Sequence, residues 1–275
     1  MSNQRARFAV TLPLKALENV KAMVVGCGGI GGYAAILLAK MGVPNMVLID
    51  HDEVEEVNVG TQIYSGDDVG KDKADVLASL CLDHSVTGGF RPIVDVFQPE
   101  HMKLLIGNPF FRSTPRRNIV ITALDNIEGR KQVWGEVYDH MPLGVVRNQL
   151  LFIDPRMMLE ALEVNALPLP NREYKLAREA YNRRICDKEQ KYIDEPCGEK
   201  AIPGTGMYAA SVIMSVVLQW LLGNRFPHLV IGSLSSSTGD MFMKSYYPEG
   251  IQSKLENVSH PAPTHSEGMN WGGSA

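Results

Sequence analysis

Met23-Val24-Val25-Gly26-Cys27-Gly28-Gly29-Ile30-Gly31-Gly32 is the stretch that decides the fold. A short apolar run ends in glycines, and the apolar pattern of a helix follows from Tyr33 to Met41. Such a turn leaves backbone N–H groups free at a helix N-terminus, where phosphate or another anion can bind. We expect Gly26 to permit the tight turn, Gly28 to let a ligand approach the backbone, and Gly31 to let the helix pack on the strand. The stretch alone leaves open a tight turn without a ligand.

Length, charge and cysteine content narrow the class of protein. The chain has 275 residues, enough for one large α/β domain or two small ones, and its formal net charge of -4 indicates no broad attraction to nucleic acid or anionic lipid. The four cysteines are scattered and contain no C-x-x-C pair, which predicts neither a disulfide framework nor a structural zinc site. The histidines show no ligand spacing either.

The apolar stretch from Met207 to Leu222 contains Ser211, Ser215 and Gln219, which favours a buried helix over a membrane span. The N-terminus lacks the apolar core of a signal peptide. We therefore expect a cytoplasmic protein.

Strands and helices alternate through the first half of the chain. We expect strands at 21–26, 45–50, 90–97, 118–122 and 144–149, and helices at 14–20, 29–41, 99–106 and 127–140, with a further helix capped by Asp68. This alternation predicts a doubly wound α/β fold with a mostly parallel sheet and right-handed crossovers.

The second half of the chain has a different pattern. Residues 157–165 alternate like a strand that Pro168 and Pro170 interrupt. We then expect a charged helix at 172–191, a polar loop at 192–204, an apolar helix at 205–222 and an antiparallel hairpin at 229–234 and 241–246. The predicted organisation is an N-terminal arm with a short helix (1–20), a single domain (21–258) and a disordered tail (259–275) rich in Pro, Ser, Gly and His.

Asp50 ends the second predicted strand, about 24 residues after Gly26. A Rossmann-type site places an acidic residue there, where its carboxylate accepts hydrogen bonds from ribose hydroxyls. The alternative is an aspartate that only caps the following loop. At this point the sequence is still compatible with an NAD-dependent oxidoreductase.

Three further blocks favour another chemistry. They are Asp50-His51-Asp52-Glu53-Val54-Glu55-Glu56-Val57-Asn58-Val59-Gly60-Thr61-Gln62, Asp68-Val69-Gly70-Lys71-Asp72-Lys73-Ala74, and Thr122-Ala123-Leu124-Asp125-Asn126 followed by Arg130. Together with the glycine loop they resemble the ThiF/MoeB family, the adenylating enzymes that activate ubiquitin-like and sulfur-carrier proteins. The resemblance covers residues 21–130 well and extends more weakly to Tyr247. An oxidoreductase needs neither Lys73 nor the Asp125-Asn126 pair.

The resemblance implies a Rossmann-type adenylation domain that uses ATP and Mg²⁺ on the C-terminal glycine of a small carrier protein, in a homodimer. Adenylation builds negative charge on phosphate oxygens, so cations and N–H dipoles are needed there. The family match assigns the phosphates to Lys73 and Mg²⁺ to Asp125, as catalytic residues. It assigns nucleotide contacts to Gly26, Gly28, Gly29, Gly31, Asp50, Asp52, Asn58, Gln62, Lys73 and Asn126. The alternatives are a solvated lysine, a helix N-cap at Asp125, and loop-ordering roles for Asn58 and Gln62.

One position departs from the family pattern. Thr61 stands where the family usually has an arginine that contacts the phosphates. Arg5 or Arg7 of the N-terminal arm could supply a cation, although the usual Arg-Gln pair of that arm is absent. The basic cluster of Arg112, Arg116 and Arg117 is another source, or simply a solvated loop. A catalytically weakened nucleotide-binding subunit therefore remains an alternative.

Cys197 is the candidate nucleophile. It lies in a crossover segment at about 186–204 that, by the resemblance, passes over the substrate tail, and Lys200 would favour its thiolate. Cys186 is the reserve candidate, and a plain surface thiol is the alternative.

Arg156 is a candidate for the substrate carboxylate. Asp154-Pro155-Arg156-Met157 resembles a segment that faces the groove for the substrate tail in some relatives, where Arg156 would bind a carboxylate or form a strand-end salt bridge. A small molecule, a precursor peptide or a tRNA-linked carboxylate are alternative substrates, and the net charge argues against tRNA.

Overall fold

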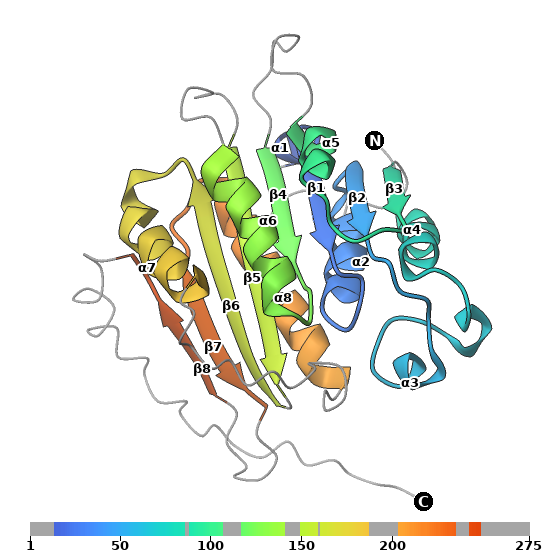
Figure 1. The fold of residues 1–275 in the computed structure, drawn as a ribbon. Helices are drawn as coiled ribbons and strands as arrows, with labels where there is room; N and C mark the ends of the chain where they lie inside the picture. Colours follow the sequence, from blue (N-terminus) through green and yellow to red (C-terminus); the bar gives the residue numbers. More distant parts are fainter. Residues whose placement is uncertain are drawn as a thin grey trace, which may run out of the picture.

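The computed structural model describes residues 14–85, 88–106, 117–140, 149–158, 160–186, 203–234 and 242–248. The described strands form one mixed sheet in the order β3-β2-β1-β4-β5-β6-β7-β8 (Figure 1). Neighbours from β3 to β5 pair in parallel, whereas β6, β7 and β8 pair antiparallel. The strands are β1 (Val20–Val25), β2 (Asn45–Ile49), β3 (Gly89–Ile93), β4 (Arg117–Thr122), β5 (Gln149–Met158), β6 (Ala161–Leu169), β7 (Leu229–Ser233) and β8 (Phe242–Tyr246). The predicted Rossmann-like fold with a C-terminal antiparallel extension is confirmed.

Helices cover both faces of the sheet. They are α1 (Leu14–Leu17), α2 (Gly31–Met41), α3 (Glu56–Val59), α4 (Lys73–Asp83), α5 (Met102–Ile106), α6 (Ile127–His140), α7 (Lys175–Cys186) and α8 (Pro203–Leu222), with short 3₁₀ turns at Gly66–Asp68, Pro99–His101 and Arg172–Tyr174. On one face, α2, α4 and α8 pack in a core that includes Val24. On the other face, α5, α6 and α7 pack in a second core that includes Met23 and Val25. Because successive side chains of β1 enter opposite cores, its sequence is almost continuously apolar.

Helix α8 is the most apolar helix of the described chain. Its residues Gly204–Leu222 are long and apolar enough to cross a membrane, with a mean hydropathy of 1.5, and 56% of that window is buried in the protein. The helix lies against α2, β5 and β6 (Figure 1). This packing supports the interpretation of the segment as a core helix.

The fifth strand continues past the end that the sequence pattern predicted. We expected 144–149, of which residues 144–148 lie outside the described residues, and the described strand β5 runs from Gln149 to Met158. The strand expected at 157–165 is wrong, because the chain reverses between β5 and β6 and pairs Met157 with Leu162. Strand β6 then continues through Pro168 to Leu169. The site candidates Asp154 and Arg156 therefore lie inside a long hairpin.

Several helix and strand ends also differ from expectation. Helix α4 begins at Lys73 with Asp72 at the N-cap position, whereas Asp68 ends a separate 3₁₀ turn. There the Asp68 carboxylate accepts hydrogen bonds from Ser65 N and Oγ, so it does not cap the helix. Strand β3 ends at Ile93 instead of Phe97. The expected hairpin at the C-terminal end is confirmed as β7 and β8.

Candidate active site

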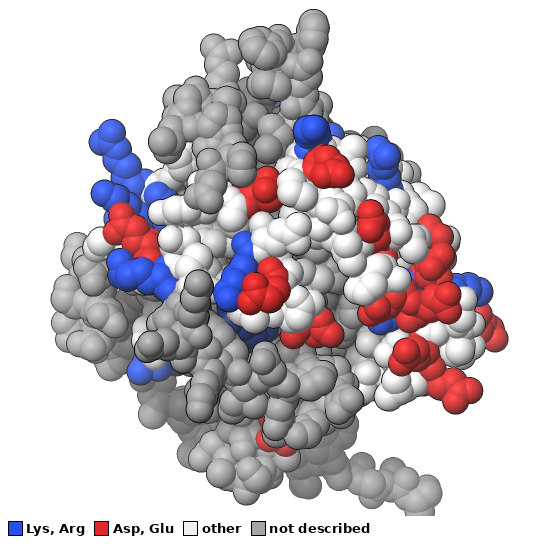
Figure 2. Space-filling model, viewed as in Figure 1, with Lys and Arg blue, Asp and Glu red and all other residues white. Residues whose placement is uncertain are grey.

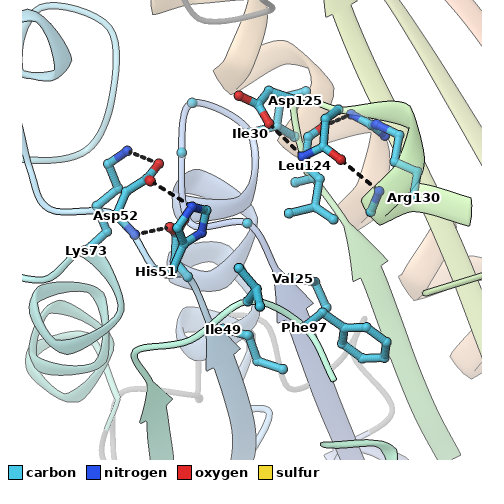
Figure 3. Close-up of a pocket in the computed structure, with 18 of the residues that line it drawn as sticks. Val25, Ile30, Ile49, His51, Asp52, Lys73, Phe97, Leu124, Asp125 and Arg130 are labelled. Atoms are coloured by element: carbon cyan, nitrogen blue, oxygen red, sulfur yellow. Dashed lines mark hydrogen bonds and ion pairs between the residues drawn. The ribbon is translucent and has the colours of Figure 1, made fainter. Parts of the chain in front are cut away.

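A pocket of about 650 Å³ lies at the carboxyl ends of β1, β2 and β4 (Figure 3). Parallel strands bring the loops that follow them to the same edge of a sheet, which is where open α/β sheets bind ligands. The predicted site residues that line this pocket are Gly26, Gly28, Gly29, Asp50, Asp52, Asn58, Gln62, Lys73, Asp125 and Asn126. Gly31 packs against Gly26 and is not among the lining residues. Cys197 lies outside the described residues. The structure thus brings together segments that are up to 100 residues apart in sequence.

The glycine loop owes its shape to close backbone contacts. Gly26 has a φ of 92°, and a Cβ there would lie 2.5 Å from Ala123 O. A Cβ on Gly31 would lie 1.9 Å from Gly26 O, so the first turn of α2 packs directly on the loop. At Gly28, by contrast, a Cβ would meet nothing closer than Gln62 Oε1 at 3.8 Å. The backbone at Gly28 is therefore open to the pocket, as the sequence predicts.

The loop presents free hydrogen-bond donors. Ile30 occupies the N-cap of α2 without a side-chain cap. Within the described residues, the backbone N–H groups of Gly28, Gly29 and Ile30 have no acceptor. Unbonded N–H groups beside a helix N-terminus favour an anion.

Asp50 is anchored by the backbone around it. Its Oδ2 accepts a hydrogen bond from Cys27 N at 2.6 Å, and its Oδ1 accepts one from Asp52 N at 2.9 Å. The loop-capping alternative is thus a real role of this side chain. The buried carboxylate also lines the pocket, where the remaining lone pairs of its oxygens can accept further hydrogen bonds.

Lys73 is buried at the first turn of α4 and forms an ion pair with Asp52. Its exposed fraction is 7%, so the alternative of a solvated helix lysine is wrong. The Nζ of Lys73 lies 3.0 Å from Asp52 Oδ2. The Tyr64 hydroxyl, 2.7 Å from Cys27 O and 3.3 Å from Lys73 O, joins the start of α4 to the glycine loop. The ammonium group is therefore held at the edge of the pocket (Figure 3).

Asn58 orders its own loop from a buried position. Its Oδ1 accepts a hydrogen bond from Glu55 N at 2.9 Å, closing a capping box on α3. The Gln62 Oε1, in contrast, is buried without a partner.

Asp125 lies across the glycine loop from Lys73 (Figure 3). The side chain is exposed and accepts one hydrogen bond, from Asn126 Nδ2 at 3.2 Å. Asn126 Oδ1 accepts a hydrogen bond from Gly129 N at 2.7 Å and so caps the first turn of α6. The N-cap alternative for Asp125 is therefore wrong, and its carboxylate is available to a ligand in the pocket.

Arg130 supports the loop that carries Asp125. The buried guanidinium forms an ion pair with Asp154 and donates to the backbone oxygens of Leu124, Thr122 (3.0 Å) and Pro155 (2.9 Å). Asp154 also accepts hydrogen bonds from Arg156 Nη2 at 2.7 Å and from the Tyr181 hydroxyl at 2.7 Å. Arg156 thus forms a salt bridge, the second of the two roles considered for it, although the pair lies within β5 and not at a strand end. Sequence reasoning missed Tyr181, and no local pattern marks it.

The buried network keeps Asp154 ionised. Burial alone would raise the pKa of this carboxyl, but Arg130 and Arg156 together hold its pKa below the usual value of an aspartate. Because the pKa is lower in the folded chain, ionised Asp154 stabilises the fold at pH values above the unfolded pKa, and this stability is lost as the pH falls through the folded pKa.

We expect Asp154→Asn to lower the free energy of unfolding by about 3 kcal/mol at pH 7, because it leaves two guanidinium groups without their buried counter-charge. The difference from the parent chain should be constant between about pH 5 and 8 and shrink below about pH 4. Urea denaturation at a series of pH values measures it. Asp83→Asn, at the exposed end of α4, is the matched control and should change little. A deficit that is unchanged at pH 3 would contradict the assigned charge.

Thr61 lines the pocket, as expected for the position of the missing arginine. Among the described lining residues, the lysine and arginine side chains are Lys73 and Arg130, and both are ion-paired. Arg117 begins β4 at the opposite end of the strand, donates to Leu221 O and lies 5.7 Å from the centre of the Trp220 ring. It therefore cannot replace the missing cation. The other candidate arginines, at positions 5, 7, 112 and 116, lie outside the described residues.

Two of the cysteines are buried in the core. Burial raises the pKa of the Cys27 thiol, and raises the pKa of Cys81 to about 12. Such thiols are poor nucleophiles. Cys186 is exposed at the end of α7.

His51 lies near two carboxylates. Ligand atoms of Asp50, His51 and Asp52 lie within 4.8 Å of one another. Both oxygens of Asp50 accept backbone hydrogen bonds and Asp52 pairs with Lys73, so we assign no metal to this group.

The lobe beside the pocket is strongly acidic. Residues 50–75 include nine Asp and Glu but two Lys. Figure 2 shows acidic side chains gathered over this part of the molecule. Polyanions are therefore repelled from this side of the pocket.

The mixed sheet and its glycine-loop pocket define an α/β protein of the Rossmann-like class. The chain belongs to the ThiF family, whose model matches residues 1–140. It is 32% identical over 119 residues to the NEDD8-activating enzyme E1 catalytic subunit of Arabidopsis thaliana. The matched region covers 43% of this chain and 24% of that protein. It is 42% identical over 81 residues to tRNA threonylcarbamoyladenosine dehydratase of Escherichia coli, covering 27% of this chain and 30% of that protein. The chain thus matches less than a third of the length of these relatives.

Solved structures resemble a larger part of the chain. A crystal structure of E. coli MccB with ATP matches with a TM-score of 0.60 and 16% identity, covering 90% of this chain and 72% of that one. At this identity the likeness shows the fold alone.

Proposed function

We propose that this protein is an ATP-dependent adenylyltransferase. Its substrate would be the C-terminal carboxylate of a ubiquitin-like or sulfur-carrier protein that ends in glycine. The observation that carries the proposal is the convergence of the glycine loop, Asp50, Lys73 and Asp125 on one pocket. Membership of the ThiF family supports the same chemistry.

The nucleotide would lie on the glycine loop. The free N–H groups of Gly28 and Gly29 and the ammonium group of Lys73 would face the phosphates, and Asp50 would accept hydrogen bonds from the ribose. Asp52 would keep Lys73 oriented until the nucleotide binds. Asn58, Gln62 and Asn126 would complete the polar contacts. The open backbone at Gly28 fits a ligand that approaches this closely.

Mg²⁺ fits the donor chemistry at Asp125. A hard cation prefers carboxylate oxygens, and the carboxylate of Asp125 is exposed in the pocket with one weak internal contact. Asp125 would hold the ion, which when bound would neutralise charge on the phosphates.

The reaction follows from these positions. A carboxylate oxygen of the substrate would form a bond to the α-phosphorus, the bond from that phosphorus to the bridging oxygen would break, and pyrophosphate would leave with the electron pair. Lys73 and the loop N–H groups would stabilise the charge that grows on the phosphate oxygens.

Thr61 supports a second candidate, a nucleotide-binding subunit with weakened catalysis. A hydroxyl group neutralises no phosphate charge, so ATP affinity should be lower than with an arginine at this position. ATP binding without any pyrophosphate exchange would favour this candidate.

Charge bears on one of the alternative substrates. A small molecule or a precursor peptide would also fit a pocket at a sheet edge. A tRNA-linked carboxylate fits less well, because the acidic lobe that borders the pocket repels a polyanion.

Transfer to a cysteine stays a prediction. Gly206, in the first turn of α8, packs against the glycine loop so closely that a Cβ would lie 2.2 Å from Gly29 O. Cys197 lies outside the described residues and is six residues before Pro203 in the sequence, where α8 begins. Cys197 therefore remains our candidate for a thioester, with Cys186 in reserve. The proposed homodimer, the cytoplasmic location and the domain limits also stay predictions.

The proposal is tested by ATP–pyrophosphate exchange with Lys73→Met. We expect exchange to fall about 100-fold, since methionine keeps the apolar stem but removes the charge aimed at the phosphates. Lys71→Met is the matched control: Lys71 is two residues away, exposed, and paired with Asp68. Purified protein is mixed with ATP, Mg²⁺, labelled pyrophosphate and a set of peptides that end in glycine.

Equal exchange in both variants would exclude Lys73 from the phosphate site. No exchange in the parent chain with any carboxylate would overturn the proposed activity.

A further inference from the structure

We propose that Tyr181 is a positioning residue for the loop at residues 122–126, and that it acts through Asp154 and Arg130. The proposal rests on the proposed function of Asp125 in that loop. None of the described residues that line the pocket belongs to α7, so Tyr181 would act on the site only through these contacts.

The contacts form an unbroken polar chain. The hydroxyl of Tyr181, on α7, donates to Asp154 Oδ2 at 2.7 Å. The other oxygen of Asp154, on β5, is paired with Arg130 of α6. Arg130 in turn donates to the carbonyl oxygens of Thr122 and of Leu124, the residue directly before Asp125.

Each link is shielded from water. The exposed fractions are 3% for Tyr181, 0% for Asp154 and 5% for Arg130. In such surroundings a hydrogen bond to an ionised group is stronger than at the surface, and a missing partner is not replaced by solvent. Arg156 also donates to Asp154 Oδ2, from Nε at 2.9 Å and from Nη2 at 2.7 Å, so loss of the Tyr181 hydroxyl would let the carboxylate shift toward Arg156 and away from Arg130.

The ring of Tyr181 fixes the direction of its hydroxyl. It packs edge-on against Trp134 at 4.9 Å between ring centres and lies 5.8 Å from Phe152. Trp134 is itself held by a hydrogen bond from its Nε1 to Asn182 Oδ1 at 2.8 Å. Removing only the hydroxyl leaves this apolar packing in place, so the polar link can be tested separately from the core.

The test compares Tyr181→Phe with Tyr174→Phe. Tyr174 is equally buried, lies just before α7, and donates its hydroxyl hydrogen to Phe226 O at 2.7 Å, outside the network. Both variants lose one buried hydroxyl, so a purely structural role predicts similar behaviour. Two readouts are taken on the full chain: amide hydrogen exchange of a peptide spanning 122–132, and the Mg²⁺ concentration for half-maximal ATP–pyrophosphate exchange.

We expect Tyr181→Phe to speed amide exchange in 122–132 and to raise the half-maximal Mg²⁺ concentration about tenfold, with Tyr174→Phe unchanged in both. Unchanged amide exchange in Tyr181→Phe would overturn the positioning role whether or not the protein is active. Faster amide exchange with an unchanged Mg²⁺ requirement would overturn the link to Asp125. Absence of pyrophosphate exchange in the parent chain would instead refute the proposed function, and the amide measurement would still decide the coupling.

Discussion

Asp125→Asn is expected to lower ATP–pyrophosphate exchange by about 100-fold to 1,000-fold while leaving the fold intact. The side chain is exposed, and its one hydrogen bond comes from its neighbour Asn126. The helix cap is provided by Asn126, so the substitution leaves the start of α6 in place. The substitution removes the negative charge of Asp125, which we propose holds the metal ion.

Asp95→Asn is the control for this variant. Asp95 is also exposed and also lines the pocket, but it follows β3 and belongs to none of the segments to which we assign the nucleotide or Mg²⁺. Its loss should change exchange by less than about threefold. Rates are measured over a range of Mg²⁺ concentrations, with circular dichroism to confirm folding. An Asp125→Asn variant that retains full activity would remove Asp125 from the mechanism.

Gly31→Ala is expected to destabilise the protein by at least about 3 kcal/mol and to prevent folding at 37 °C. Its Cβ would lie 1.9 Å from Gly26 O and 3.2 Å from Val24 Cγ1. The first of these atoms belongs to the backbone of the glycine loop, so no side chain can rotate away. The clash can be relieved only if α2 moves away from β1, which would disrupt the core between them.

Gly135→Ala is the opposite case and serves as the control. Gly135 lies inside α6, and a Cβ there meets nothing within 4 Å. Alanine should stabilise the helix by up to about 1 kcal/mol, since it loses less backbone entropy on folding than glycine. Urea denaturation of both variants gives the comparison. Equal effects of the two substitutions would contradict the packing of α2 on the loop.

The parallel half of the fold and most of its site were accessible from local patterns. Apolar runs that end near Gly26, Asp50 and Asp125 predict three strands and the loops that follow them. They can do so because the periods of strands and helices are properties of short segments. Once the sheet is parallel, the carboxyl ends of these strands must share one edge. The parallel sheet alone therefore predicts that these residues lie together in one pocket.

The ends of some strands and helices could not be predicted from local patterns, because tertiary packing determines them. The sequence pattern ended the fifth strand at Gln149, whereas pairing with β4 runs from Arg117↔Gln149 to Ile121↔Ile153. Four aspartates compete for the start of α4, at positions 67, 68, 72 and 75. The backbone bridge between Glu53 and Asp72 places the helix start after Asp72. Propensity is nearly equal among these choices, so tertiary contacts determine the outcome.

By itself, the sequence determined the glycine turn, the alternation of strands and helices, and the set of polar residues at the strand ends, because each depends on neighbours in the chain. The tertiary structure alone decided the partners of those residues. Arg130, Asp154 and Tyr181 are separated by 24 and 27 residues, and each taken singly is an ordinary charged or aromatic side chain. Their association depends on how α6, β5 and α7 pack, since burial selects the partner for a charge only after the core has formed.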